Sequence, residues 1–474
     1  MRKRLIPPTR HPLDPALRPP SDRTALVVPP SHGAAAIGAQ LRATARSIAG
    51  TVLALTFAML ALGPAVAQPT EIHGQIKGEG GRRIPIAIPA TVAPAGPLAA
   101  PAAEIQQTLI DDLAYSGYFE IIPTASLASL PPIDPGNPQM TPWRATGAEA
   151  VVAMRAEPQG DQIALAWRLY GTTSPELLLG KRYASDRDLA RLLAHRIASE
   201  ITAHFTGQTG VSLSRIAFVS KHGPGKEVYA MDYDGQRIRR LTTTGTINLS
   251  PVWSPDGTRL AFLSFRQRQP SLYILQTDGT ITRLPMAGGD LNSAPSWSPD
   301  GKRIAFSSSR DGNSEIYVMD IATGRERRMT ENPAIDTSPA WSPTGRELAF
   351  TSDRTGSPQL YVMDAEGGSA RRLTFEGAYN ESACWSPREG RIVYVSRIEG
   401  KFALMLYDIA AQKSTRLLGG PFNCEDPHWS PDGRHIAFAS DKDGAFQIYT
   451  IDADGSNLRR LTRGEPSFTP DWSR

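Results

Sequence analysis

Acidic, amide and imidazole side chains recur at one place along the chain, just before a series of tryptophans. Carboxylates and imidazoles can hold a metal ion or transfer protons in hydrolysis. The same groups can also form a solvated, hydrogen-bonding wall around a binding surface. Because four of these nine side chains are amides and no histidines cluster there, we expect a binding rim, with no catalytic residue and no metal ligand. The set comprises Asn248, Asn292, Asp336, Asn380, Glu381, Asn423, Glu425, Asp426 and His428.

Known catalytic motifs are absent from the sequence. It contains no Gly-x-Ser-x-Gly elbow, no phosphate-binding loop and no His-Glu-x-x-His. We therefore expect a protein that is not an enzyme and carries no cofactor. Two alternatives stay open. One is a secreted hydrolase built on a β-propeller, in which carboxylates in the central channel would be catalytic. The other is a scaffold that binds another protein of the cell envelope. The two cysteines, Cys384 and Cys424, stand at different distances from the next tryptophan, which favours free thiols over a disulfide.

A repeat of 44 residues must position these side chains. Trp253-Ser254-Pro255-Asp256-Gly257 recurs with drift at Trp297, Trp341, Trp385 and Trp429, and a last copy begins at Trp472. Each unit contains four strand-like segments, in the second unit residues 248–254, 259–264, 271–275 and 280–284. Such a period with strand content predicts a β-propeller with one four-stranded blade per repeat. We expect the tryptophans to pack between blades.

Ring closure is also predicted. The first repeat has Thr209 where its tryptophan should stand, and residues 467–472 supply the missing strand from the end of the chain. Six blades then close into a ring, which removes exposed sheet edges. The expected fold is an α/β N-terminal domain followed by an all-β six-bladed propeller.

The first part of the chain has the pattern of an export signal. Residues 1–67 hold eight of the 51 Lys and Arg residues but two of the 47 acidic ones, and the apolar run 48–62 precedes Ala65-Val66-Ala67. We predict cleavage after Ala67 and not a membrane anchor, because the run is short for a span. The remaining 43 basic and 45 acidic residues nearly balance, which argues against nucleic acid as a partner.

The predicted domains follow in order. Residues 1–67 are a signal peptide with a Pro-rich extension, and 68–83 a flexible segment. In the α/β domain, 84–207, strands are expected at 83–89, 118–122, 150–155, 162–170 and 176–183, a loop at 123–142, and helices at 103–116 and 186–205. Ser185 should cap the second helix, Leu192 should lie on its buried side, and Gly207 should end it. Residues 208–213 are a linker and 214–474 the propeller.

Three stretches resemble the TolB family of periplasmic propeller proteins of the Tol-Pal system: residues 112–119 (DLAYSGYF), 194–207 and 214–218 (SRIAF). The resemblance implies a monomeric periplasmic adaptor without membrane insertion. It would bind the lipoprotein Pal, other outer-membrane lipoproteins and TolA, maintain outer-membrane integrity and support cell division. It implies a Pal site at the propeller mouth, made of Leu291, Asn292, Ala294, Asp336, Thr337, Asn380 and Glu381. It implies a TolA site in the N-terminal segment, with Gln68, Glu71, Ile72 and Ile76.

Overall fold

The computed structural model describes residues 82–473 apart from 134–137, 175, 268, 289–290 and 389. The predicted signal peptide, its cleavage site and the TolA-facing residues therefore lie outside the described residues. No helix in the described part of the chain has the length and apolar character needed to cross a membrane.

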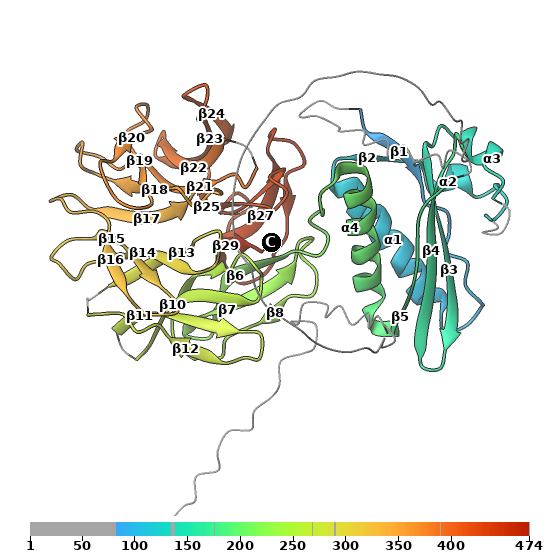
Figure 1. The fold of residues 1–474 in the computed structure, drawn as a ribbon, viewed down its shortest axis with the longest axis horizontal. Coiled ribbons are helices and arrows are strands. Elements are labelled where there is room, and N and C mark those ends of the chain that lie inside the picture. Colours follow the sequence, from blue (N-terminus) through green and yellow to red (C-terminus); the bar gives the residue numbers. More distant parts are fainter. Residues whose placement is uncertain are drawn as a thin grey trace, which may run out of the picture. The chain divides into compact units, whose positions relative to one another are not determined.

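The N-terminal region is a five-stranded mixed sheet with two long helices against one face (Figure 1). In the sheet order β2-β1-β3-β4-β5, β1 runs parallel to both neighbours and the other pairs are antiparallel. The elements are β1 (Ile84–Ala87), α1 (Ala99–Tyr115), β2 (Phe119–Ile121), α2 (Thr124–Leu127), α3 (Thr141–Arg144), β3 (Ala150–Gln159), β4 (Gln162–Gly171), β5 (Leu177–Asp186) and α4 (Ala190–Thr206). Alternating apolar residues of β3 and β4 and the apolar faces of α1 and α4 form one core.

Three local predictions were wrong here. The expected loop at 123–142 contains the short helix α2, and the short helix α3 begins within it at Thr141. Ser185 does not cap α4, because β5 continues through it and a 3₁₀ turn, Arg187–Leu189, leads into the helix. Leu192 is 38% exposed and does not belong to the core. Gly207 does end α4, with φ of 72° in the left-handed region that glycine enters without steric cost.

The propeller consists of six four-stranded antiparallel sheets, which confirms the predicted fold class. Blade one is β29 (Ser467–Trp472), β6 (Arg215–His222), β7 (Gly225–Asp232) and β8 (Arg239–Arg240). Blade two is β9 (Asn248–Trp253), β10 (Arg259–Gln267), β11 (Gln269–Gln276) and β12 (Ile281–Arg283). Blade three is β13 (Asn292–Trp297), β14 (Arg303–Ser308), β15 (Glu315–Asp320) and β16 (Glu326–Arg328).

The other three blades repeat this order. Blade four is β17 (Asp336–Trp341), β18 (Glu347–Ser352), β19 (Gln359–Asp364) and β20 (Arg371–Arg372). Blade five is β21 (Asn380–Trp385), β22 (Arg391–Ile398), β23 (Lys401–Asp408) and β24 (Lys413–Leu418). Blade six is β25 (Cys424–Trp429), β26 (His435–Ser440), β27 (Gln447–Asp452) and β28 (Arg459–Arg460).

The C-terminal strand closes the ring as predicted. β29 pairs antiparallel with β6, with Ser467 opposite Ser220 and Trp472 opposite Ile216. The indole N–H of Trp472 donates to the Ser214 hydroxyl over 2.7 Å. The first sheet therefore takes its innermost strand from the far end of the chain, and this strand covers the inner edge of β6.

The repeated tryptophans pack between neighbouring blades, as expected. Trp297 of blade three lies in a core cluster with Ala261 and Leu263 of blade two. An arginine from the preceding blade covers the indole: the Arg259 guanidinium is 4.7 Å from the Trp297 ring, and Arg303 is equally far from Trp341. The tryptophan thus contributes apolar area at each joint and, at the joints of Trp253, Trp297, Trp341 and Trp429, a cation–π contact as well.

Two edges of the propeller follow from the strand directions. Antiparallel pairing sets Asn248, which starts β9, beside Ser264 near the end of β10, and sets Trp253 beside Leu260. We call the edge where the innermost strands start the entry edge; it includes Ile247, Leu291, Ile335 and Tyr379. The edge that carries the turns after the tryptophans is the turn edge.

A buried polar cluster joins the N-terminal region to the turn edge of blade one. Asp112 of α1 accepts a hydrogen bond from the Tyr233 hydroxyl over 2.6 Å and lies 2.7 Å from Nδ1 of His195 on α4. All three side chains are buried. Burial raises the pKa of Asp112, while its bonds to His195 and Tyr233 lower it. Arg191 of α4 pairs with Asp234, which adjoins Tyr233.

Candidate functional site

The channel wall is built from the innermost strands, each of which bends at its third residue. There the antiparallel register shifts and a residue other than glycine takes a positive φ of 46–56°. Such a bulge re-aims the side chains on either side of it. The six residues are Ser250, Ala294, Ser338, Ser382, Asp426 and Thr469.

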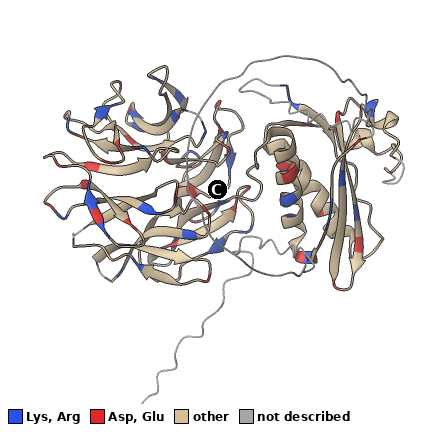
Figure 2. Cartoon of the chain, viewed as in Figure 1, with Lys and Arg blue, Asp and Glu red and all other residues tan. Residues whose placement is uncertain are grey.

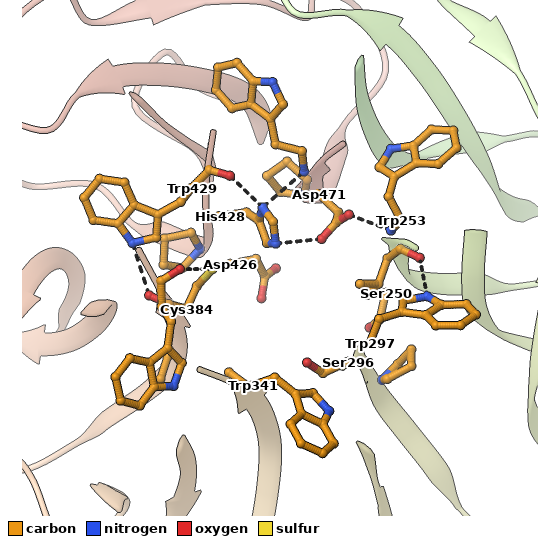
Figure 3. A pocket seen from close by; sticks show the side chains of 18 of the residues that line it. Ser250, Trp253, Ser296, Trp297, Trp341, Cys384, Asp426, His428, Trp429 and Asp471 are labelled. Carbon is orange, nitrogen blue, oxygen red and sulfur yellow. Dashed lines mark hydrogen bonds and ion pairs between the residues drawn. The ribbon is translucent and has the colours of Figure 1, made fainter. Parts of the chain in front are cut away.

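The channel opens into a cavity of about 310 Å³ towards the turn edge. Its wall includes the six bent residues, the tryptophans and the side chain just before each tryptophan. Figure 3 shows Asp426, His428 and Asp471 on one side of this cavity, with Ser250 and Ser296 on another. The titratable groups of the cavity wall, Cys384, Asp426, His428 and Asp471, therefore all lie on blades five, six and one.

Three carboxyl groups of the channel have raised pKa values. Burial, together with the charges of Glu425 and Glu381, raises the pKa of Asp426 to about 7. Burial also raises the pKa of Glu381 and of Glu425, and nearby carboxylates add to the effect on Glu425. Carboxyl groups with raised pKa values are one feature that a catalytic carboxylate site requires, and the channel has this feature. Among the residues that the structure describes, no three His, Cys, Asp or Glu side chains are placed to hold a metal ion.

The entry edge carries exposed apolar side chains at equivalent positions of consecutive blades. Ile247, Leu291 and Ile335 are 41%, 39% and 51% exposed, and each directly precedes an innermost strand. Their carbonyls accept hydrogen bonds from the backbone N–H groups of Phe265, Ser309 and Asp353, which lie towards or just after the end of the second strand of the same blade. These bonds fix the three residues in the same register. Phe375, in the loop that leads from blade four into blade five, is 74% exposed. Large apolar side chains exposed in a series are typical of a protein-binding surface.

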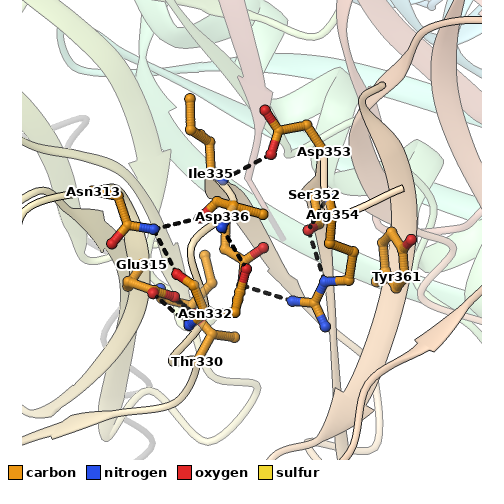
Figure 4. Close-up of polar contacts among 12 residues, drawn as sticks. Asn313, Glu315, Thr330, Asn332, Ile335, Asp336, Ser352, Asp353, Arg354 and Tyr361 are labelled. Atoms are coloured by element: carbon orange, nitrogen blue, oxygen red, sulfur yellow. Dashed lines mark hydrogen bonds and ion pairs between the residues drawn. The ribbon is translucent and has the colours of Figure 1, made fainter. Parts of the chain in front are cut away.

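Ion pairs and hydrogen bonds hold these loops (Figure 4). Asp336 is buried and accepts from Arg354 over 2.7 Å and from Asn332 over 2.8 Å. Asp353 accepts the backbone N–H of Ile335 over 2.8 Å. The exposed Ile335 therefore stands on a backbone that is fixed from both sides, which lowers the entropy lost when a partner binds.

A second hydrogen-bonding arrangement repeats in four blades. A threonine hydroxyl donates to a buried Glu or Gln at the start of the third strand and accepts the next backbone N–H of that strand. In blade three, Thr330 donates to Glu315 over 2.6 Å and accepts from Ile316. The other threonine–acceptor pairs are Thr242 with Glu227, Thr374 with Gln359, and Thr462 with Gln447. These buried groups are satisfied within the blade and are structural.

The residues predicted to face Pal fall into two groups. Asn292, Asp336 and Asn380 are buried and tied to their own loops, Asn380 through Gln359. Leu291 is exposed, while Thr337, Ala294 and Glu381 are half-buried along the channel. The sequence reasoning missed Ile247, Ile335 and Phe375. The sequence contained a signal for two of these residues, because Ile247 and Ile335 stand one repeat of 44 residues before and after Leu291.

Charge does not single out one face. Figure 2 shows basic and acidic residues interspersed over the blades and the N-terminal helices.

Fold and site together define a closed six-bladed propeller that follows an α/β domain and carries a row of exposed apolar side chains at one edge. Two family models match the chain: the TolB beta propeller domain over residues 203–474 and the TolB amino-terminal domain over residues 74–178. The chain belongs to the TolB family.

Individual relatives of the chain also come from the TolB family. The Tol-Pal system protein TolB of Geobacter sulfurreducens is 37% identical over 212 residues, which is 44% of this chain and 48% of the relative. That of Cereibacter sphaeroides strain ATCC 17025 is 32% identical over 219 residues, 45% of this chain and 49% of the relative. These matches span about half the length of the curated relatives. The crystal structure of TolB from Acinetobacter baumannii superposes with a TM-score of 0.71 at 28% identity, covering 83% of this chain and 97% of that one.

Proposed function

We propose that the chain is a periplasmic adaptor of the Tol-Pal system that acts by binding and not by catalysis. The entry edge binds the lipoprotein Pal, and the segment 68–83, with Gln68, Glu71, Ile72 and Ile76, binds TolA. The chain is exported, cleaved after Ala67, and works as a monomer that maintains outer-membrane integrity and supports cell division. Family membership supports this assignment.

The observation that carries the Pal site is the row of exposed apolar side chains at the entry edge. Ile335 and Phe375 are the most exposed of them. Burying such side chains against a partner removes apolar area from water, and a few residues of this kind usually dominate an interface. Thr337 and Glu381, on the channel side of the same edge, complete the surface. The buried Asn292, Asp336 and Asn380 hold the loops and make no direct contact.

Paired substitutions test this placement. Ile335→Ser and Phe375→Ser should each weaken binding of the soluble domain of Pal by about tenfold or more, measured by calorimetry. Leu177→Ser is the matched control, because Leu177 is 52% exposed but belongs to β5 of the N-terminal region. The placement is wrong if Leu177→Ser weakens Pal binding as much as the other two, or if neither entry-edge variant weakens it.

The two partner sites are coupled in this proposal. Pal binding at the entry edge biases the N-terminal segment between a docked and a released state, and the coupling is reciprocal. Its structural support is the buried cluster of Asp112, His195 and Tyr233, which joins both long helices to blade one. Removing residues 68–82 should abolish TolA binding and change the affinity for Pal. Equal Pal affinity with and without the segment would refute the coupling but leave the Pal site untouched.

The raised pKa values of Glu381, Glu425 and Asp426 favour a second candidate, a propeller hydrolase that uses channel carboxylates. This candidate predicts a hydrolytic activity that is lost in Glu381→Gln and Glu425→Gln while Pal binding stays intact. Metal analysis of the purified protein is the first discriminating measurement.

A further inference from the structure

The sheet of the N-terminal region has a second face, opposite α1 and α4, that is only partly covered (Figure 1). At one end of this face, α2 and α3 pack on Val151 and Tyr170 and form a small core with them. Further along the same two strands, this face carries the half-buried Ala153 of β3 and Ala166 of β4. Because their methyl groups fill little space, a cavity of about 770 Å³ remains beside them.

The wall of this cavity is mainly apolar. α2 and the segment after it contribute Leu127, Leu130 and Ile133, and α3 contributes Trp143. The segment after β1 contributes Val92, whose side chain is 41% exposed although its backbone is bridged to β3. A cavity of this volume and lining has the size and character of a small-molecule pocket and is too small for a folded partner.

The charged residues of the wall are two arginines, Arg155 of β3 and Arg168 of β4. Arg155 pairs in register with Ala166, and Arg168 with Ala153, so the two arginines are diagonal neighbours on the same face of the sheet. Within the described part of the chain, neither guanidinium has a carboxylate or other hydrogen-bonding partner. Two cationic groups of the wall are therefore available to a ligand.

The neighbouring acid does not supply the missing negative charge. Glu157 follows Arg155 on the same face of β3, but its carboxylate pairs with Arg182 of β5 over 3.2 Å. No Asp or Glu lines the cavity among the residues that the structure describes. Two adjacent guanidinium groups repel each other, and an anion bound between them offsets this repulsion with charge-assisted hydrogen bonds. The wall therefore favours a ligand that carries a negative charge.

Two other polar side chains of the wall are already engaged. The amide of Gln106 donates to the carbonyl of Ile88 over 3.1 Å, and the amide of Gln107 donates to the Asp111 carboxylate over 2.9 Å. A peptide in this cavity would bury N–H and C=O groups that find few partners, which costs free energy. An alkyl chain has no such groups, so the wall fits a hydrocarbon better than a peptide.

We propose that this cavity binds a single-chain carboxylate of the fatty-acid type, with its alkyl chain on the two alanines and its carboxylate at Arg155 and Arg168. The planar guanidinium donates paired hydrogen bonds that match the two oxygens of a carboxylate. The alkyl chain is held because its apolar area leaves water. The site uses no residue of the entry edge, so the proposal does not depend on Pal binding there.

Calorimetric titration of the full mature chain with dodecanoate, below its micelle concentration, tests the proposal. We expect one site per chain. Decanoate, which is two CH₂ groups shorter, should bind roughly tenfold more weakly, because each buried CH₂ contributes about three- to fourfold in affinity. Dodecyltrimethylammonium, a cation with the same chain, should also bind about tenfold more weakly than dodecanoate. Equal affinities for the anion and the cation, no binding of dodecanoate, or tighter binding of trileucine than of dodecanoate would overturn the proposal.

Substitution of the arginines tests the position of the carboxylate. Arg155→Gln and Arg168→Gln should each weaken dodecanoate binding about threefold to tenfold and leave the affinity for dodecyltrimethylammonium no lower than in the wild type. Arg144→Gln is the matched control, because Arg144 is an exposed arginine of α3 that does not line the cavity. The assignment is wrong if Arg144→Gln weakens dodecanoate binding as much as the other two, or if neither of those weakens it.

Filling the cavity tests the position of the alkyl chain. Ala166→Leu places a larger side chain on the floor of the cavity and should reduce dodecanoate affinity about tenfold or more. Thermal unfolding shows whether this variant is folded. Undiminished binding by folded Ala166→Leu would contradict the proposal. If the variant does not fold, the arginine variants and the comparison of decanoate with dodecanoate decide, and equal affinities for these two carboxylates would refute burial of the chain.

Discussion

Replacing Asp426 by asparagine should stabilise the folded protein at alkaline pH. In the channel wall, burial and the charges of Glu425 and Glu381 raise the pKa of Asp426 to about 7, against an ordinary value of 3.8. The folded protein therefore keeps a proton that the unfolded chain gives up. The stability that this proton confers is complete below pH 3.8 and is lost as the pH rises through about 7. Asparagine tolerates the positive φ of 51° at this position, so the change removes charge without straining the backbone.

The size of the effect follows from the same pKa values. The interval from 3.8 to about 7, at 1.36 kcal/mol for each unit of pKa, sets an upper limit of about 4 kcal/mol at pH 8. Water in the channel and small rearrangements reduce this, so we expect a gain of about 1–3 kcal/mol in the free energy of unfolding. At pH 5 the gain should be smaller, because the folded wild type is still protonated there.

Urea unfolding of wild type and Asp426→Asn at pH 5 and pH 8 measures both numbers. Asp278→Asn is the control, since Asp278 is an exposed turn carboxylate whose pKa is lowered by hydrogen bonds to Thr280. Its replacement should bring no gain that grows with pH. If Asp426→Asn gains nothing at pH 8, or gains equally at both pH values, the carboxylate is not held in a destabilising environment and the reasoning fails.

Two further substitutions, each with a comparison variant, test the fold. Trp472→Ala and Trp341→Ala should each cost about 3–5 kcal/mol of unfolding free energy, because both indoles are buried at equivalent blade joints. If urea unfolding shows a much smaller loss for Trp472→Ala than for Trp341→Ala, closure of the ring by β29 is contradicted. Tyr233→Phe removes the donor to buried Asp112 and should cost about 1–3 kcal/mol. Tyr361→Phe, whose hydroxyl bonds the Thr355 side chain, should cost less, and equal urea midpoints for the two variants would contradict a special role for the Asp112 cluster.

The period of 44 residues determined most of the architecture. Each repeat is one supersecondary unit, with strands marked by alternation and turns marked by Pro, Asp and Gly, so its outline could be recognised locally. Position 209 holds a threonine where a tryptophan is expected, and the chain ends with an extra strand whose last residue is Trp472. Together these two features predicted the closing strand, which the pairing of β29 with β6 confirms. Gly207 likewise marked the end of α4, because only local backbone geometry is involved.

The tertiary structure alone decided which side chains of the channel strands are buried, exposed or paired. Asp336 is buried and the adjacent Ile335 is exposed. Both are held by a separate loop, in which Arg354 pairs with Asp336 and Asp353 accepts the backbone N–H of Ile335. The strand also bends at Ser338, where φ is positive. A serine at positive φ gives no local signal, since few such residues adopt that conformation. The partnership of Asp112 with His195, 83 residues away, likewise depends on how α1 packs against α4. Distances between side chains from separate elements arise only from packing, which the sequence pattern does not encode at any single position.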